Sequence, residues 1–133
     1  MAKINKFIFW TPRILAILFI LFLAMFSLDI FGNNYTFWET VLGLFMHNIP
    51  VFILLTLLII SWKHELVGAV TFILAGVLYI AMILINALKG SFEWYMLSWS
   101  LTIAGPAFLV GYLFFLNWKQ KKKLGKKRLI KRK

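Results

Sequence analysis

Apolar residues in this chain come in four long runs, separated by short stretches that hold most of the polar residues. The runs cover residues 12–31, 37–61, 66–85 and 95–118. At ~1.5 Å per residue, a helix of about 20 residues spans the roughly 30 Å hydrocarbon core of a bilayer. Because charged residues are nearly absent from the runs, the pattern predicts an all-α fold, a membrane-embedded four-helix transmembrane bundle.

Local signals mark where the runs begin and end. Thr11-Pro12 pairs a hydroxyl N-cap with proline at the first helical position, which predicts the start of the first span. Gly32-Asn33-Asn34 is typical of a turn. Thr36 and Glu39 have capping-box spacing and start the second span at residue 37. The length of the first apolar run favours a retained span over a cleaved signal peptide.

Positive charge is concentrated at one end of the chain. Its 133 residues have a net charge of +11, and ten of the fifteen Lys and Arg residues follow Trp118. Residues 119–133 are cationic with few apolar side chains, which predicts a disordered basic tail. The positive-inside rule places both termini in the cytoplasm and the protein in the cell membrane. We expect Arg13 to snorkel to lipid phosphates, and Lys63 and Glu65 to form a solvated turn.

The basic tail is predicted to bind anionic lipid head groups. Each cation near such a surface adds ~1 kcal/mol of attraction. Docking on RNA, the ribosome or an acidic partner is the alternative, with nucleic acid less favoured because the charge is not spread over a soluble surface. The predicted lipid contacts are Lys119, Lys121, Lys122, Lys123, Lys126, Lys127, Arg128, Lys131, Arg132 and Lys133.

Composition excludes several kinds of chemistry. The chain is 62% hydrophobic and has no cysteine, which removes disulfides, thiolate nucleophiles and zinc–thiolate sites. The sequence shows no nucleophile–base constellation, phosphate-binding glycine loop or cluster with metal-ligand spacing. We therefore expect no enzymatic activity and no cofactor.

The second span carries polar residues near its middle. Pro50 removes a helix hydrogen bond and leaves the carbonyl of Met46 without its partner, and Pro106 acts likewise in the fourth span. In lipid such carbonyls need donors from within the protein. We predict that the second and fourth spans touch, with His47 as a donor. The candidate intramembrane polar site comprises His47, Asn48, Pro50, Ser98, Thr102 and Pro106.

Two roles for His47 stay open at this point. A neutral imidazole can act as a hydrogen-bonding link between helices, or it can handle a proton or a ligand. A metal or haem site needs a second ligand at similar depth. His64, the other histidine, lies in the turn between the second and third spans and is too far away.

Small residues and a possible repeat bear on helix packing. Gly68, Thr71, Ala75 and Gly76 form a small-residue face on the third span, which predicts close approach of a neighbouring helix. A shift of 56 residues also aligns Pro50 with Pro106. Duplication of a helical hairpin and chance similarity between span ends both account for this alignment.

Short motifs in a characteristic order cover nearly the whole chain up to residue 118. They are Phe9-Trp10-Thr11-Pro12-Arg13, Asp29-Ile30-Phe31-Gly32, Phe37-Trp38-Glu39, His47 with Pro50, Trp62-Lys63 with Glu65, Gly105-Pro106, and Asn117-Trp118. In these the chain resembles a family of small, uncharacterised four-span prokaryotic membrane proteins. That family has an aromatic residue where His64 stands. The resemblance implies the architecture and adds no reaction.

The leading functional hypothesis is a structural or accessory membrane protein that interacts with another membrane component. Its partners are expected to be the lipid bilayer, a second copy of the chain or another membrane protein. The alternative is a small oligomeric transporter or channel that uses His47 near the bilayer midplane.

Overall fold

The structure, a computed structural model, describes residues 5–90 and 93–131. In these ranges the chain is helical. Helix α1 spans Lys6–Met25 and continues into a short 3-10 helix, η1, at Phe26–Gly32. Helices α2, α3 and α4 span Phe37–Ser61, Glu65–Leu88 and Trp94–Ile130. All four segments, α1 with η1 and each later helix, are long and apolar enough to cross a membrane.

The predicted start of α2 is confirmed. Thr36 is the N-cap, its hydroxyl accepts from the backbone N–H of Glu39, and the Glu39 carboxylate accepts from Thr36 N–H at 2.9 Å. The predicted start of α1 is wrong. The Asn5 side chain caps the helix by accepting from Phe7 N–H, and the Thr11 hydroxyl donates back to the Phe7 carbonyl. Pro12 therefore lies inside the helix.

Helix α4 extends about three turns beyond the predicted end of the fourth span. The structure is helical through Ile130, so the disorder predicted after Trp118 is wrong for the part of the tail that is described. Lys, Gln, Leu and Arg are good helix formers, and a helix already nucleated within the apolar run extends at little cost. Cations also interact favourably with the carbonyl end of the helix dipole.

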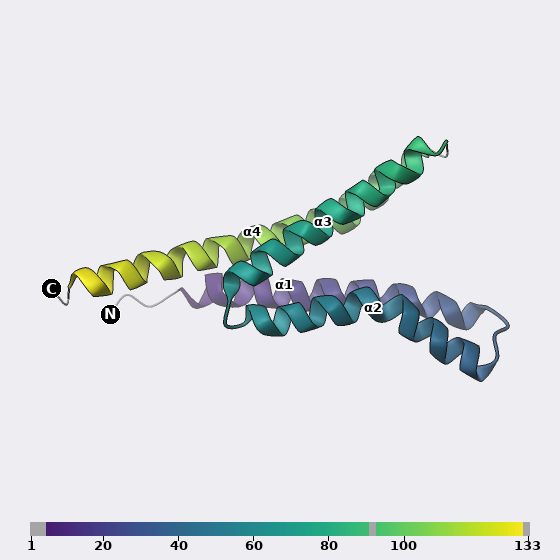
Figure 1. The fold of residues 1–133 in the computed structure, drawn as a ribbon, viewed down its shortest axis with the longest axis horizontal. Helices are drawn as coiled ribbons and strands as arrows, with labels where there is room; N and C mark the ends of the chain where they lie inside the picture. The colour runs from purple at the N-terminus through teal and green to yellow at the C-terminus, as the bar shows by residue number, and fades with distance from the viewer. Residues whose placement is uncertain (1–4, 91–92, 132–133) are drawn as a thin grey trace.

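The helices form two antiparallel hairpins, α1–α2 and α3–α4. Figure 1 shows the hairpins packed together over the half near the two chain termini and diverging toward the other end. Helix α3 packs most extensively on α4, and α1 contacts both α2 and α4. Helices α2 and α4 do not pack side by side within the described residues, so they lie on a diagonal of the bundle.

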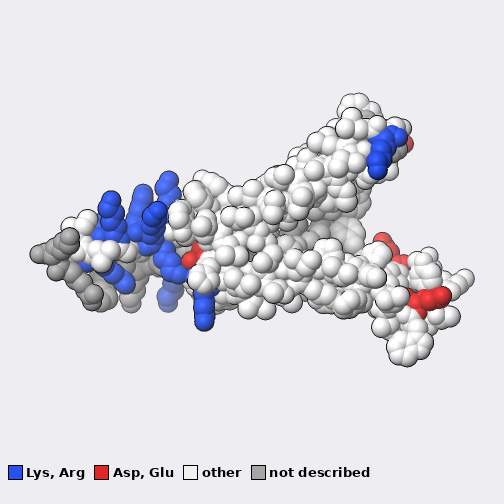
Figure 2. Space-filling model, in the orientation of Figure 1, with Lys and Arg blue, Asp and Glu red and all other residues white. Residues whose placement is uncertain are grey.

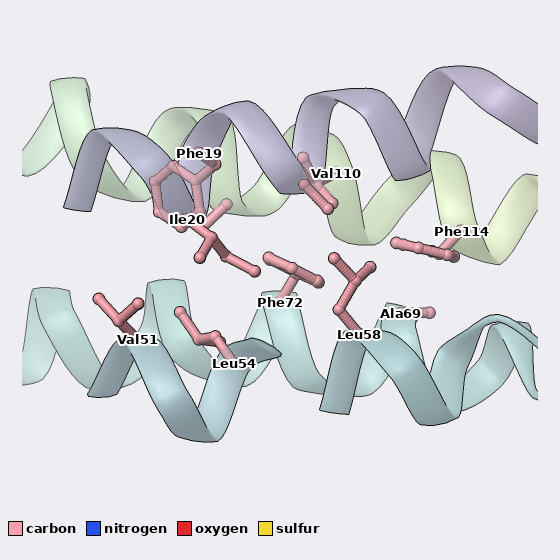
Figure 3. Close-up of a cluster of buried hydrophobic side chains, with 11 residues drawn as sticks. Phe19, Ile20, Val51, Leu54, Leu58, Ala69, Phe72, Val110 and Phe114 are labelled. Carbon is pink, nitrogen blue, oxygen red and sulfur yellow. The ribbon is translucent and has the colours of Figure 1, made fainter. Parts of the chain in front are cut away.

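The hydrophobic core lies where the hairpins meet. Phe72 and Phe114 are completely buried and their rings stack with centroids 6.1 Å apart. Figure 3 shows Phe19 and Ile20 facing Val51 and Leu54 across the core. Nearly all buried apolar residues come from this half of the molecule, so the diverging half of each hairpin has little core of its own.

Glycines bring α3 and α4 close together. A methyl group added at Gly68 would lie 2.9 Å from the Phe114 ring, and one at Gly76 would lie 2.9 Å from Phe108. These contacts confirm the predicted small-residue face of the third span at both glycines. Lipid is as apolar as the helices, so the hydrophobic effect does not drive helices together there. Helices in lipid associate through close packing, which small residues allow.

Charged side chains gather at the two ends of the molecule. Figure 2 shows most of the Lys and Arg side chains at the end where the termini lie, with acidic groups toward the opposite end. Asp29 of η1, Glu39 in the first turn of α2 and Glu93 at the N-cap of α4 lie at that far end. The basic end consists of the start of α1, the α2–α3 turn and the last turns of α4.

Candidate functional site

The residues of the predicted midplane site are not brought together. His47, Asn48 and Pro50 lie on α2, and Ser98, Thr102 and Pro106 lie on α4, which does not pack beside α2. The Asn48 amide donates to the Leu44 carbonyl at 2.9 Å, and the Thr102 hydroxyl donates to the Ser98 carbonyl at 2.8 Å. Both polar groups are thus satisfied within their own helices. The predicted contact between the second and fourth spans is wrong.

His47 is exposed on the diverging half of α2. It precedes the buried Val51 by four residues and Leu54 by seven, so it shares the helix face that packs in the core farther along. The core-facing side of α2 is therefore uncovered at His47, because the α3–α4 hairpin has already turned away. No hydrogen bond to the imidazole is found among the described residues.

A buried charge cluster occupies the basic end instead. Arg13 of α1 has no exposed surface, and the carboxylate of Glu65, the first residue of α3, is 3% exposed. One Glu65 oxygen lies 3.5 Å from Arg13 Nη2 and 2.8 Å from Lys121 Nζ of α4. Arg13, Glu65 and Lys121, called the charge cluster below, thus connect both hairpins.

Helix ends supply the remaining partners of Arg13. Its guanidinium donates to the Phe9 carbonyl and, at 3.1 Å, to the carbonyl of Trp62, the C-cap of α2. The last carbonyls of a helix have no intrahelical partner and carry partial negative charge. Glu65 lies in the first turn of α3, where the dipole favours an anion. Each charge is therefore placed at the helix end that stabilises it.

Aromatic rings enclose the guanidinium. The Arg13 Cζ atom lies 3.6 Å from the Phe9 ring centroid, 5.6 Å from Trp62 and 5.7 Å from Phe114. Arginine suits such a site because its delocalised charge is weakly hydrated and its planar group packs against aromatic faces. The rings exclude water, so the ion pair is screened far less than a surface pair.

Unused hydrogen-bonding capacity remains next to the cluster. Arg13 Nε and both amide atoms of Asn117 are buried without a hydrogen-bond partner among the described residues. Asn117 lies one helical turn before Lys121 on α4. These buried polar atoms have unused hydrogen-bonding capacity. The site can therefore form a further hydrogen bond with a polar group that reaches it.

Two sequence-based expectations for this region are wrong. Arg13 does not snorkel to phosphates and Glu65 is not solvated, because each neutralises the other inside the protein. The sequence does contain a feature that indicates the Arg13–Glu65 ion pair. Of the four acidic residues, Glu65 alone falls at the basic end, so it was the one carboxylate available to an arginine two residues into an apolar run.

Comparison with known families places the chain in a family with no assigned activity. Residues 1–126 match the domain of unknown function DUF7670. The chain belongs to the DUF7670 family. The match covers α1, α2 and α3 and continues along α4 to residue 126, which includes Lys121 of the charge cluster. No curated protein and no solved structure matches the DUF7670 chain.

The motifs that carry the family resemblance converge on the charge cluster. Three of them, separate in sequence, meet at the basic end: residues 9–13 supply Arg13, residues 62–65 supply Glu65, and residues 117–118 supply the buried Asn117. This DUF7670 site holds no nucleophile beside a base. Within residues 5–90 and 93–131, no three His, Cys, Asp or Glu side chains come close enough to hold a metal ion.

Proposed function

We propose that this protein is a multi-pass integral membrane protein with both termini in the cytoplasm, and that it acts as an accessory protein binding another membrane component. Four helices of sufficient length and apolarity support the membrane location. The gathering of cations at one end supports the orientation, because Lys and Arg near span ends are retained on the cytoplasmic side.

The basic end of α4 supports binding to anionic lipid. Beyond Trp118 the helix presents a run of lysines and arginines, and Lys122 Nζ lies 5.0 Å above the Trp118 ring. Trp is favoured at the membrane interface, so the ring locates the level of the head groups. Cations beyond that level attract anionic head groups with ~1 kcal/mol each.

The uncovered imidazole of His47 carries the proposal of a protein partner. In hydrocarbon, a polar group without a hydrogen bond costs several kcal/mol. His47 lies ten residues, about 15 Å, from the start of α2, which is about half the bilayer core. A partner helix seated against this face would hydrogen-bond the ring and cover the apolar residues around it.

We expect a photoreactive residue at position 47 to crosslink a discrete membrane protein in native membranes. Position 45 is the matched control, because Phe45 is 58% exposed, lies at the same depth and points to the opposite side of α2. Crosslinked species are identified by mass spectrometry. Equal labelling from both positions, or lipid adducts alone, would contradict the proposal.

The alternative function, an oligomeric transporter, depends on the same imidazole. It requires the partner to be a second copy of the chain and His47 to line a path between copies. Purified protein in liposomes should then carry a pH-dependent flux that is lost in His47→Ala. Crosslinking from position 47 without such a flux would support the accessory role. Within one copy, the described helices place no second ionisable side chain beside His47, so a proton path would need a second copy.

A further inference from the structure

The part of α4 that follows Trp118 gathers exposed lysines on one face. Their spacing of three and four residues keeps them within about 100° of the helix circumference. The same face ends one turn later in an apolar side chain, which is 65% exposed. These residues, called the basic stripe below, are Lys119, Lys122, Lys123, Lys126 and Ile130. Figure 1 shows this part of α4 continuing past the turn that joins α2 to α3.

None of the protein's four acidic side chains, all of which lie within the described residues, neutralises the basic stripe. Three are at the far end of the bundle, and the fourth, Glu65, is buried against Arg13 and Lys121. Lys121 points away from the stripe, because it follows Lys119 by two residues on the helix. Like charges three and four residues apart destabilise a helix. An anion bound from outside the chain removes that repulsion.

The outer part of the basic stripe lies beyond the reach of lipid head groups. Helix α4 is unbroken as far as Ile130, so each residue after Trp118 lies ~1.5 Å farther along the helix axis. Lys126 is about 12 Å and Ile130 about 18 Å beyond Trp118, whereas exposed charges are screened beyond a Debye length of ~8 Å. Head groups at the level of Trp118 therefore attract the first lysines of the stripe and leave its outer end to another anion.

Ile130 favours a protein over a nucleic acid as the source of that anion. Its side chain is exposed outside the apolar runs, and its neighbour Leu129 is 67% exposed. A protein segment covers such side chains with apolar residues of its own, whereas a phosphate backbone offers only charge. Residues 119–133 also contain no aromatic side chain on which the bases of a single strand would stack.

We propose that the basic stripe docks an acidic amphipathic helix of a cytoplasmic protein. Carboxylates three and four residues apart on that helix face the lysines, and an apolar residue one turn beyond them packs on Ile130. Charge steers the encounter, and the apolar contact slows dissociation. The inference rests on the proposed cytoplasmic location of the basic end, and it adds a soluble partner to the membrane partner proposed at His47.

Two triple variants with equal loss of charge test the stripe. Full-length protein in phosphatidylcholine nanodiscs is titrated with a fluorescent helical peptide whose glutamates and single leucine repeat the spacing of the stripe, and anisotropy is measured. Replacing Lys122, Lys123 and Lys126 by Gln should weaken binding about tenfold or more. The control replaces Lys127, Arg128 and Lys131, which lie outside the stripe, and should weaken it less than about threefold. Both variants keep the charge cluster, because Lys121 is unchanged.

Three results would overturn the proposal. Equal weakening in the two triple variants would show that net charge alone attracts the peptide. Tighter binding of polyuridylate RNA than of the peptide would assign the stripe to nucleic acid. Loss of peptide binding in nanodiscs that contain phosphatidylglycerol would assign it to head groups. The proposal expects Ile130→Gln to weaken peptide binding about threefold and to leave RNA binding unchanged.

The outcome is separable from the failure of the proposed function. Carbonate extraction reports whether the protein is membrane-integrated, and protease treatment of sealed vesicles reports which side the basic end faces. An outward-facing basic end would overturn the proposed orientation, and with it a cytoplasmic partner, even if the peptide bound in nanodiscs. With the expected orientation, stripe-dependent peptide binding would stand even where crosslinking from position 47 found no membrane partner.

Discussion

Replacing Arg13 by methionine should destabilise the folded protein by about 3–5 kcal/mol, the usual cost of breaking a buried ion pair. The carboxylate of Glu65, which is 3% exposed, would remain buried with only Lys121 as a counter-charge. The carbonyl of Trp62 at the end of α2 would also lose its donor. Equilibrium unfolding in mixed micelles, followed by circular dichroism, measures the change in unfolding free energy.

Two controls separate charge from packing. Lys121→Met should cost less than about 1 kcal/mol, because the Lys121 side chain is 47% exposed and its ion pair is partly solvated. Combining Arg13→Met with Glu65→Leu should recover much of the loss, since the unpaired buried carboxylate is then gone. If the double variant cost as much as the two single variants added together, Arg13 and Glu65 would not be coupled.

Arg13→Lys is a further informative variant. An ammonium group has the same charge but lacks the planar fork that lets the guanidinium reach the Phe9 carbonyl, the Trp62 carbonyl and Glu65 together. It should therefore retain only part of the stability. Full stability in this variant would show that charge alone, without the geometry of the guanidinium, accounts for the site.

The helices were predictable from sequence because the bilayer thickness fixes how long an apolar run must be. Helix α2 matches its predicted range, and the capping box at Thr36 explains why. The predicted ends of the other helices were less accurate. Asn5 caps α1 earlier than the Thr11-Pro12 pattern indicated, and α4 runs past Trp118 because its lysine-rich extension is a good helix former.

The neighbours of each helix were much harder to predict. In a membrane helix the lipid-facing and core-facing sides are both apolar, so hydrophobic periodicity does not give the rotation of the helix about its axis. That is why His47 was assigned to a contact with α4 that does not form. Polar residues carry more information. The pairing of Arg13 with Glu65 was missed from the sequence, although Glu65 is the one acidic residue of the sequence that falls among the basic residues at that end.

Glycine contacts explain which pairing the fold adopts. At Gly111 of α4 an added methyl group would lie 2.6 Å from the Ile73 side chain, 3.0 Å from the Ile73 nitrogen and 3.1 Å from the Ala69 carbonyl oxygen. Two of these atoms belong to the α3 backbone, which cannot move aside as a side chain can. The α3–α4 pair is therefore held at a separation that only glycine permits at position 111.

Gly111→Ala should accordingly destabilise the protein by about 1–3 kcal/mol, the range for overpacked sites. Gly125→Ala is the matched control on the same helix, because nothing lies within 4 Å of its added methyl group. That variant should gain up to ~1 kcal/mol from helix propensity alone. Gly68→Ala should cost a similar amount to Gly111→Ala, since its methyl group would lie 2.9 Å from the Phe114 ring and from Ser61 Cβ, and both residues are fully buried.

The same variants test whether α3–α4 packing supports the charge cluster. Phe114 lies both against Gly68 and 5.7 Å from the guanidinium of Arg13, so separating α3 from α4 should loosen the aromatic enclosure of the ion pair. We expect Gly111→Ala to reduce the additional loss caused by Arg13→Met, measured as a double-mutant cycle in the same micelles. Strict additivity would mean that the glycine contact and the charge cluster stabilise the bundle independently, and unchanged stability in Gly111→Ala would contradict the close helix approach itself.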